Sequence, residues 1–138
     1  YNIKITSMQQ VKKSPTRNDL FPIASNFTRE DPEIVVTCVY DAGCVEWVKA
    51  MKNANWSPKA QIFTVCIGMA SFEEGVGTDS EYMMGISPWH QSLPIQDAVT
   101  GWSAMEFAAK FQDYTQLSVT YHAASSAASL GILVLAIE

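Results

Sequence analysis

The chain has 138 residues, of which 48% are hydrophobic and 17% charged, an ordinary balance for one globular domain with a real core. Its formal net charge is −5, and its nine Lys and Arg residues are scattered, with Lys12-Lys13 as the one adjacent pair. Nucleic acids and anionic membrane surfaces reward clustered basic residues, so we expect neither to be the main partner.

The first third of the chain predicts a strand, a helix and a strand. Ile3–Gln9 alternates apolar and polar residues, which predicts a short strand. Thr16 or Asn18 begins a helix, and Asp31-Pro32 ends it. The apolar side of this helix carries Leu20, Phe21, Ile23 and Ala24. The β-branched run Ile34–Tyr40 does not alternate, so it predicts a strand with both faces covered.

The middle of the chain continues the alternation of helices and strands. Asp41 is the predicted cap of a helix that ends around Asn53–Pro58. The apolar stripe of that helix contains Cys44, Val45, Val48 and Met51. Gln61–Ile67 predicts a second buried strand, which Gly68 and a short polar helix around Ser71–Glu74 follow. Glu81–Ile86 predicts the last strand.

Two helices are predicted after the loop at Ser87–Trp89. Asp97 begins the first, whose helical stripe contains Ala98, Trp102, Met105 and Ala109. Thr115 or Thr120 opens the second, Tyr121–Glu138, which is apolar all round and therefore expected to be buried. The order of elements predicts one α/β domain, a three-layer, mostly parallel open sheet with right-handed crossovers.

Both ends of the sequence look as if they are cut from a longer polypeptide. The chain passes from Tyr1 straight into the first predicted strand, and it stops at Glu138 inside an apolar helix without a terminating Gly, Asn or Pro. The longest apolar stretch, Leu130–Ile137, is too short to span a bilayer. We therefore expect a fragment, and the missing signal peptide carries no information about location.

The sequence contains no recognisable catalytic, metal or cofactor motif. The three cysteines, Cys38, Cys44 and Cys66, cannot all pair with one another and have no zinc spacing, so we interpret them as small buried core residues. A nucleophilic pair of Cys44 with His90 is the one enzymatic arrangement that we considered, since a cysteine in a first helical turn can have a lowered pKa. His122 is interpreted as a structural helix residue. We expect no cofactor and no metal.

Ligands of an open parallel sheet bind outside the carboxyl ends of its strands, where helix N-termini present free N–H groups. In this chain those ends are the segments Cys38–Ala42, Val65–Ser71 and Ser87–His90. The Glu73-Glu74 pair is interpreted as a solvated helix face. The sequons Asn26-Phe27-Thr28 and Asn55-Trp56-Ser57 permit a secretory origin.

Five segments, in order, resemble the second lobe of the type I periplasmic binding proteins. These are NFTREDPEIVVTCVY at 26–40, DAGCVEWVKAMKNANWSPK at 41–59, QIFTVCIGMAS at 61–71, GISPWHQSLP at 85–94 and YHAASSAASLGILVLAIE at 121–138. The family includes branched-chain amino acid receptors of ABC transporters and the ligand-binding regions of extracellular receptors. The resemblance implies a Rossmann/flavodoxin-like lobe spanning residues 1–138, in the periplasm or outside the cell.

In this family the ligand lies between two lobes, which implies a small polar, amino-acid-like ligand and a first lobe that the chain lacks. Carried over by position, the ligand contacts are Tyr40, Asp41, Cys66, Ile67, Gly68 and Met69. The loop at Cys66–Gly68 lacks the acid that often pairs with the ligand's ammonium group, and Asp41 is a candidate substitute. Further expected partners are a membrane permease or receptor module, and a second copy of the fragment.

Two other interpretations stay open beside this non-enzymatic one. The first is an enzyme on a flavodoxin-like fold, for which a reactive Cys44 thiol would be the sign. The second is an interaction or dimerisation module that keeps the lobe without a ligand, which the missing acid near Cys66 favours.

Overall fold

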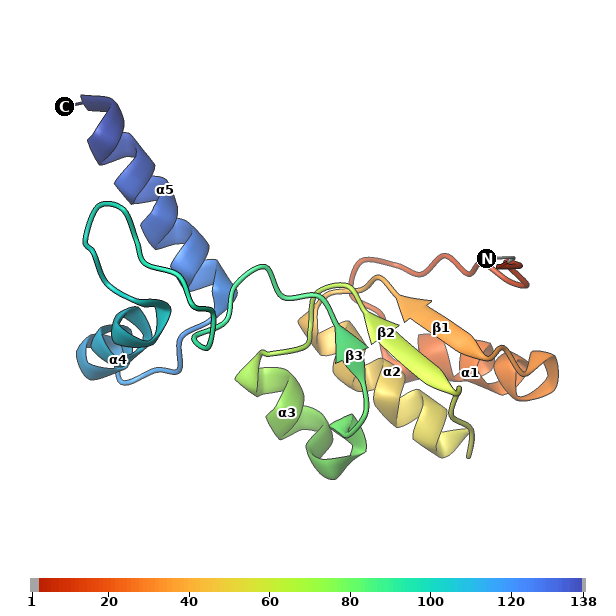
Figure 1. Cartoon of the computed structure of the whole chain (residues 1–138). Coiled ribbons are helices and arrows are strands. Elements are labelled where there is room, and N and C mark those ends of the chain that lie inside the picture. Colours follow the sequence, from red (N-terminus) through yellow and green to blue (C-terminus); the bar gives the residue numbers. More distant parts are fainter. Residues whose placement is uncertain (1–2, 138) are drawn as a thin grey trace. The chain divides into compact units, whose positions relative to one another are not determined.

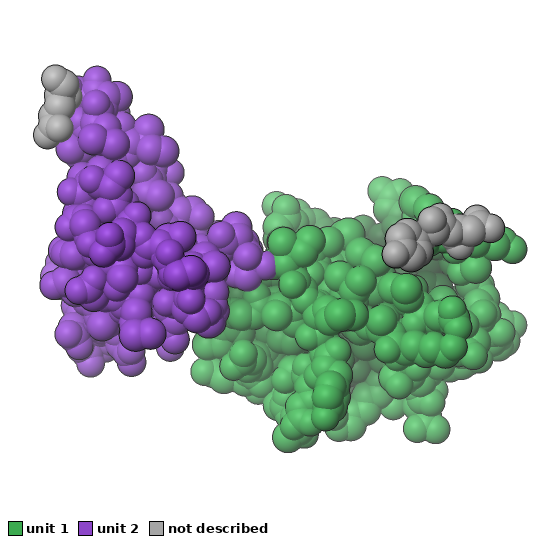
Figure 2. Space-filling model, in the orientation of Figure 1, with its two compact units in different colours: residues 1–86 green, residues 87–138 purple. Residues whose placement is uncertain are grey.

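The computed structural model describes residues 3–137. The chain divides into two compact units, Tyr1–Ile86 and Ser87–Glu138, which Figure 2 shows in green and purple. The first contains helices α1 (Arg17–Glu30), α2 (Asp41–Asn53) and α3 (Ala70–Val76), the 3-10 turn η1 (Gly77–Ser80), and strands β1 (Ile34–Thr37), β2 (Ala60–Phe63) and β3 (Met84–Gly85). The second contains α4 (Ala104–Thr115) and α5 (Tyr121–Ile137) (Figure 1).

The sheet of the first unit is open, parallel and three-stranded, in the order β1-β2-β3 (Figure 1). Val36 lies opposite Ile62, which in turn lies opposite Met84. The predicted parallel pairing is therefore confirmed, and the mixture of helices with a small open parallel sheet is compatible with the predicted α/β class. The strands at 34–40, 61–67 and 81–86 are shorter than predicted, because the chain leaves the hydrogen-bonded ladder after Thr37, Phe63 and Gly85.

Helix α1 begins and ends where the sequence predicts. Thr16 is its N-cap in a capping box with Asp19, and Asp31 closes it in the left-handed conformation at φ 44°. Hydrogen bonds from Lys12 and Thr16 hold the pKa of the Asp19 carboxyl well below its usual range. Leu20 and Ala24 are buried as expected, whereas Phe21 is exposed.

One hydrophobic core joins the three helices to one face of the sheet. It consists of Leu20, Ala24, Phe27, Val35, Cys44, Trp47, Val48, Ala50, Met51, Phe63, Cys66 and Phe72. Phe63 is fully buried and meets Phe72 edge to face at 5.3 Å between ring centroids. Buried polar side chains cross the core: the Trp47 indole N–H donates to Oε1 of Gln61 at 3.1 Å, and Nε2 of Gln61 donates to the Thr37 hydroxyl. Because each of these groups has a partner, their burial is tolerated.

The other face of the sheet is exposed, so the prediction that Ile34–Tyr40 is covered on both faces is wrong. Ile34 and Val36 are 56% and 58% exposed to solvent, because the helices of residues 3–86 pack on the opposite face of the sheet. The predicted strand at Ile3–Gln9 is also wrong, since this segment has no strand partner and Ile3 is 81% exposed. Alternation alone forms no strand without a neighbour to pair with.

The second unit differs from prediction at its start. Asp97 does not begin a helix but accepts hydrogen bonds from the backbone of Val99 and Thr100, which closes a turn. Helix α4 begins instead at Ala104, after the N-cap Ser103, which forms a capping box with Glu106. The predicted stripe through Ala98, Trp102, Met105 and Ala109 is therefore wrong, and the buried residues of α4 are Ala104 and Ala108.

Helix α5 has the predicted extent up to Ile137, and Glu138 lies outside the described residues. Its expected burial is wrong, since of its described residues only Ala124 is buried. His122 stacks on Tyr121 with ring centroids 4.0 Å apart. Among residues 3–137, no helix combines the length and hydropathy needed to cross a bilayer.

Candidate functional site

The carboxyl ends of β1 and β2 bring two of the predicted segments together. The β1–α2 connection carries Tyr40 and Asp41, and the β2–α3 connection carries Cys66–Met69. Parallel strands end at the same edge of a sheet, so both connections emerge side by side. We refer to these two connections, with the first turns of α2 and α3, as the carboxyl edge.

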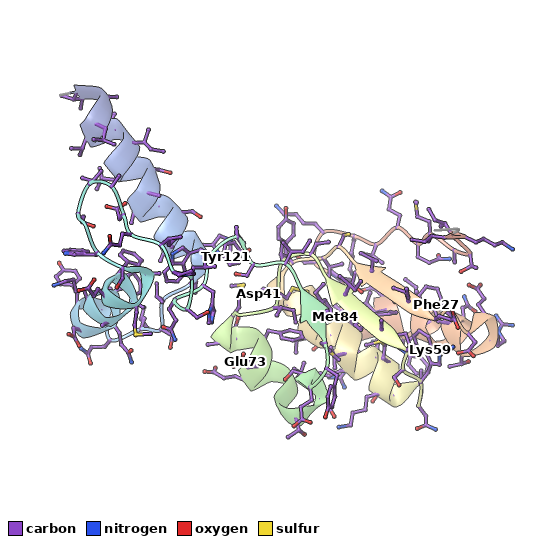
Figure 3. The ribbon with its side chains drawn as sticks, in the orientation of Figure 1. Phe27, Asp41, Lys59, Glu73, Met84 and Tyr121 are labelled. Atoms are coloured by element: carbon purple, nitrogen blue, oxygen red, sulfur yellow. A yellow bond between two sulfur atoms is a disulfide. The ribbon has the colours of Figure 1, made fainter. Side chains whose placement is uncertain are left out.

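A side-chain hydrogen bond ties the two connections to each other. The Ser71 hydroxyl in the first turn of α3 donates to Oδ2 of Asp41 at 3.0 Å. The N-cap of α2 is Tyr40 and Asp41 is the first helical residue, so the predicted capping role of Asp41 is wrong. Figure 3 labels Asp41 at this end of α2. Ser71 is a member of the site that the sequence did not reveal as a partner of Asp41.

The second oxygen of the Asp41 carboxylate is the most unusual polar atom of the edge. Oδ1 is shielded from solvent and accepts no hydrogen bond from any residue that the structure describes. A buried acceptor without a donor costs free energy, which a donor group brought by a bound molecule would recover. Asp41 can therefore accept a hydrogen bond from an ammonium, amide or hydroxyl group.

A disulfide joins α2 to the β2–α3 connection and so links the two sides of the carboxyl edge. Cys44 in α2 is bonded to Cys66 in the β2–α3 connection, with 6.4 Å between their Cα atoms, and both residues are fully buried. Their sulfurs lie 3.5 and 3.6 Å from the Val39 carbonyl oxygen. The interpretation of three buried core cysteines is thus wrong for Cys38, which is free and exposed. Cys44 carries no thiol in this state, so it offers no nucleophile for a pair with His90.

The rest of the β2–α3 connection is held by packing and backbone geometry. Ile67 leans over β3 so closely that a Cβ on Gly85 would lie 2.3 Å from it, which explains the glycine. Gly68 has φ +83°, a conformation that other residues rarely adopt, and it turns the chain outward. Met69 is the N-cap of α3. The loop is therefore pre-shaped, with Gly68 exposed and Cys66 and Ile67 turned inward.

Of the six predicted contact residues, Tyr40 and Gly68 are exposed at the carboxyl edge, and Asp41 and Met69 are half-buried there. Tyr40 is 69% exposed, so its ring forms a rim that a ligand could meet without displacing core residues. Cys66 is instead buried in the core and Ile67 packs against Gly85, so these two residues hold the loop in place. Glu73 and Glu74 are exposed on α3, which confirms their interpretation as a solvated face.

Two shallow hollows lie elsewhere in the first unit. One, of about 470 Å³, is lined by Arg17, Asn18, Phe21 and Asn53. The other, of about 310 Å³, lies at the carboxyl end of α2 beside the ion pair of Lys52 with Asp79 at 2.6 Å. None of the six predicted contact residues lines either hollow. Within residues 3–137, no three His, Cys, Asp or Glu side chains gather closely enough to hold a metal ion.

A comparison with protein-family models, with curated proteins and with solved structures finds no match for this chain. What the chain does must therefore be inferred from its own geometry and from the resemblance of its segments.

Proposed function

We propose that this chain is one lobe of an extracellular or periplasmic binding protein, and that its carboxyl edge contacts a small polar, amino-acid-like molecule. The observation that carries the proposal is the Asp41 carboxylate, which is anchored by Ser71 through one oxygen while the other lacks a donor. An ammonium group of the ligand would satisfy that oxygen with a charge-assisted hydrogen bond. The Cys66–Gly68 loop lacks the acid that often pairs with the ligand's ammonium group in the type I periplasmic binding proteins. In this proposal Asp41 takes the place of that acid.

The surroundings of Asp41 support the same proposal. The Cys44–Cys66 disulfide and the packing of Ile67 on Gly85 hold the two connections in one arrangement before a ligand arrives. A pre-arranged site loses less entropy on binding. The Tyr40 ring beside it offers an amphipathic contact surface. Because Oδ1 is shielded, binding requires a small side-chain movement at the edge.

Several parts of the proposal follow from the resemblance to the type I periplasmic binding proteins. These are a first lobe that closes over the carboxyl edge, and a permease or receptor module as partner. A disulfide favours an oxidising compartment, which agrees with a location outside the cytoplasm.

The decisive experiment is a thermal-shift screen on a polypeptide that carries this chain together with its first lobe. Amino acids, amides and small carboxylates form the panel. A ligand that binds only the folded protein raises its apparent stability, by about 2.7 kcal/mol at a hundredfold excess over Kd. A saturable rise for compounds with an ammonium group supports the proposal, and a melt that none of the panel moves counts against it.

A pair of variants places the binding at the carboxyl edge. Asp41→Asn keeps the shape and the Ser71 contact but removes the charge, so we expect affinity for an ammonium ligand to fall at least tenfold. Glu74→Gln removes one charge from the exposed face of α3 and is the matched control, with affinity unchanged. An equal loss of affinity in both variants would mean that the effect comes from the net charge of the chain and not from the position of Asp41.

The missing acid in the Cys66–Gly68 loop favours a second candidate, a lobe kept for protein contacts without a ligand. A fold that is intact in both lobes, together with an interlobe surface that no ligand reaches, would favour this candidate over the first.

A further inference from the structure

One of the two sequons lies in an exposed turn, where the chain leaves α2. Asn55 has φ 51°, and both Asn55 and Ser57 are exposed. The tripeptide Asn55-Trp56-Ser57 lies between α2 and β2, outside both elements. An oligosaccharyltransferase has to hold the asparagine amide and the hydroxyl two residues later in one active site, which an exposed irregular segment permits. The folded chain therefore presents this sequon.

The other sequon, Asn26-Phe27-Thr28, lies inside α1. Residues two apart on a helix point about 200° apart around its axis, so Asn26 and Thr28 face different sides. Oδ1 of Asn26 accepts a hydrogen bond from Arg29 at 2.6 Å. The Thr28 hydroxyl donates to the Ser25 carbonyl at 2.7 Å. Phe27, labelled in Figure 3, belongs to the core, so an enzyme reaches this sequon only if α1 unfolds.

The exposed sequon borders the hollow at the carboxyl end of α2, which we call the α2 hollow. Asn55, Trp56 and Ser57 all line it. The rest of its lining combines apolar side chains with an ion pair: Val48, Met51, Met83, Lys52 and Asp79. Its volume of about 310 Å³ is at the small end of small-molecule sites and suits one sugar ring.

The Trp56 ring is held in place beside this hollow. Its indole N–H donates to Oδ1 of Asp31 at 3.3 Å, and it meets Phe27 edge to face with ring centroids 5.7 Å apart. Trp56 is half-buried, so part of the ring stays open toward the hollow that it lines. An aromatic ring with an open side offers an apolar surface to the C–H groups of a sugar. A sugar attached to Asn55 thus has a contact surface on the next residue.

We propose that Asn55 carries an N-linked glycan, and that its first sugar ring lies in the α2 hollow against Trp56. In the reaction, Nδ2 of Asn55 attacks the anomeric carbon of an oligosaccharide carried on a polyprenyl diphosphate. A C–N bond forms and the C–O bond to the diphosphate breaks. The diphosphate leaves with the bonding electrons, and Nδ2 gives up one proton to a base of the transferase. The inference rests on the proposed function in one respect, because a location outside the cytoplasm brings the chain past the transferase.

The test uses the purified whole chain, with its disulfide intact, as the acceptor for an oligosaccharyltransferase and a lipid-linked oligosaccharide. Mass spectrometry of the peptides locates the glycan. We expect transfer to Asn55 but not to Asn26 in the folded chain, and transfer to both once the chain is reduced and unfolded. Ser57→Ala removes the required hydroxyl and should abolish transfer to Asn55, whereas Ser57→Thr keeps the hydroxyl and should retain it. A folded chain that accepts nothing at Asn55, or as much at Asn26, would overturn the inference.

The place of the first sugar is tested by methionine oxidation. An endoglycosidase trims the glycan to one sugar on Asn55, and the Asn55→Gln chain carries none. Met83 lines the α2 hollow and is half-buried, so hydrogen peroxide should oxidise it about twofold more slowly when the sugar is present. Met105, which is 65% exposed on α4, is the internal reference and should react equally in both chains. Equal rates at Met83 would contradict a sugar in the hollow.

The glycan test and the ligand test fail independently of each other. Transfer to Asn55 needs no ligand at the carboxyl edge, so a chain that binds no amino acid can still accept the glycan. A chain that accepts no glycan can likewise still bind a ligand through Asp41.

Discussion

Of the residues that the structure describes, twelve form the core of the first unit, whereas in the second unit three alanines, Ala104, Ala108 and Ala124, are the buried hydrophobic residues. The first unit is held by burial and by a disulfide, and the second by aromatic contacts such as Trp89 with Phe107 and by polar caps such as Ser103 with Glu106. Burial of large apolar side chains stabilises far more than a cap does. The candidate site is therefore built on the more rigid unit, and the second unit is expected to open first.

The largest effect that would sharpen this contrast is expected from Phe63→Ala. Phe63 is fully buried at the centre of the core and contacts Phe72, so removing its ring leaves a cavity. We expect a loss of about 3–5 kcal/mol in the free energy of unfolding, measured by urea denaturation of the first unit. Tyr114→Ala in α4 is the control, because Tyr114 is 92% exposed and its loss should cost almost nothing. Equal losses in the two variants would contradict the contrast.

Removal of the disulfide is expected to have the next largest effect. Cys44 and Cys66 are 22 residues apart, and closing a loop of that length restricts the unfolded chain by about 3 kcal/mol. Cys44→Ala combined with Cys66→Ala should lower the stability of the first unit by about this amount and leave hydrogen exchange in α4 unchanged. Cys38→Ser should change neither, since Cys38 is exposed and unpaired. Thiol titration of the native wild type should detect one reactive cysteine.

A smaller effect is expected from Ser103→Ala, which removes the N-cap of α4. The Ser103 hydroxyl accepts from the Glu106 backbone at 3.2 Å, and loss of such a cap costs about 1 kcal/mol. Amide exchange along α4 should accelerate several-fold, while exchange in α2 stays the same. The matched control, Ser125→Ala on α5, removes an exposed hydroxyl that caps no helix. An acceleration in α2 as well would mean that the two units unfold together.

The smallest effect is expected from acid. The Thr100 N–H lowers the pKa of Asp97 and the Ser103 N–H lowers that of Glu106, so both carboxylates are stabilised in the folded state. Their contribution is present above their ordinary pKa values and is lost as the pH falls through the folded ones. Helicity and exchange protection in the second unit should therefore decline below about pH 4, before those of the core. Glu106→Gln should flatten this decline.

The sequence predicted the elements that depend on local signals. The start of α1 at Thr16, one of the two predicted caps, the breaks at Asp31 and Asn53, and the parallel pairing all follow from neighbouring residues and from the alternation of elements. At 97–104 two local signals competed. Both Asp97 and Ser103 can cap a helix, and the Asp97 side chain is used by the turn that places Ser103.

Features that depend on distant partners were harder to predict. Burial of Ile34, Val36 and α5 was inferred from hydrophobicity, which tells that a surface needs a cover but not whether the chain provides it. The pairing of Cys44 with Cys66 could not be chosen among three cysteines without coordinates. The segments Cys38–Ala42 and Val65–Ser71 were predicted to meet because parallel strands end at one edge, whereas the bond from Ser71 to Asp41 needed side-chain positions.

The measurement that tests the central claim most directly is a ¹H–¹⁵N NMR titration of this chain with small amino acids. The account predicts saturable shifts in the amides of residues 40–44 and 67–71, weak in affinity because one lobe supplies half of the site, and none in α4. Shifts confined to residues 87–137, or equally large shifts in the Asp41→Asn chain, would contradict a ligand site at the carboxyl edge.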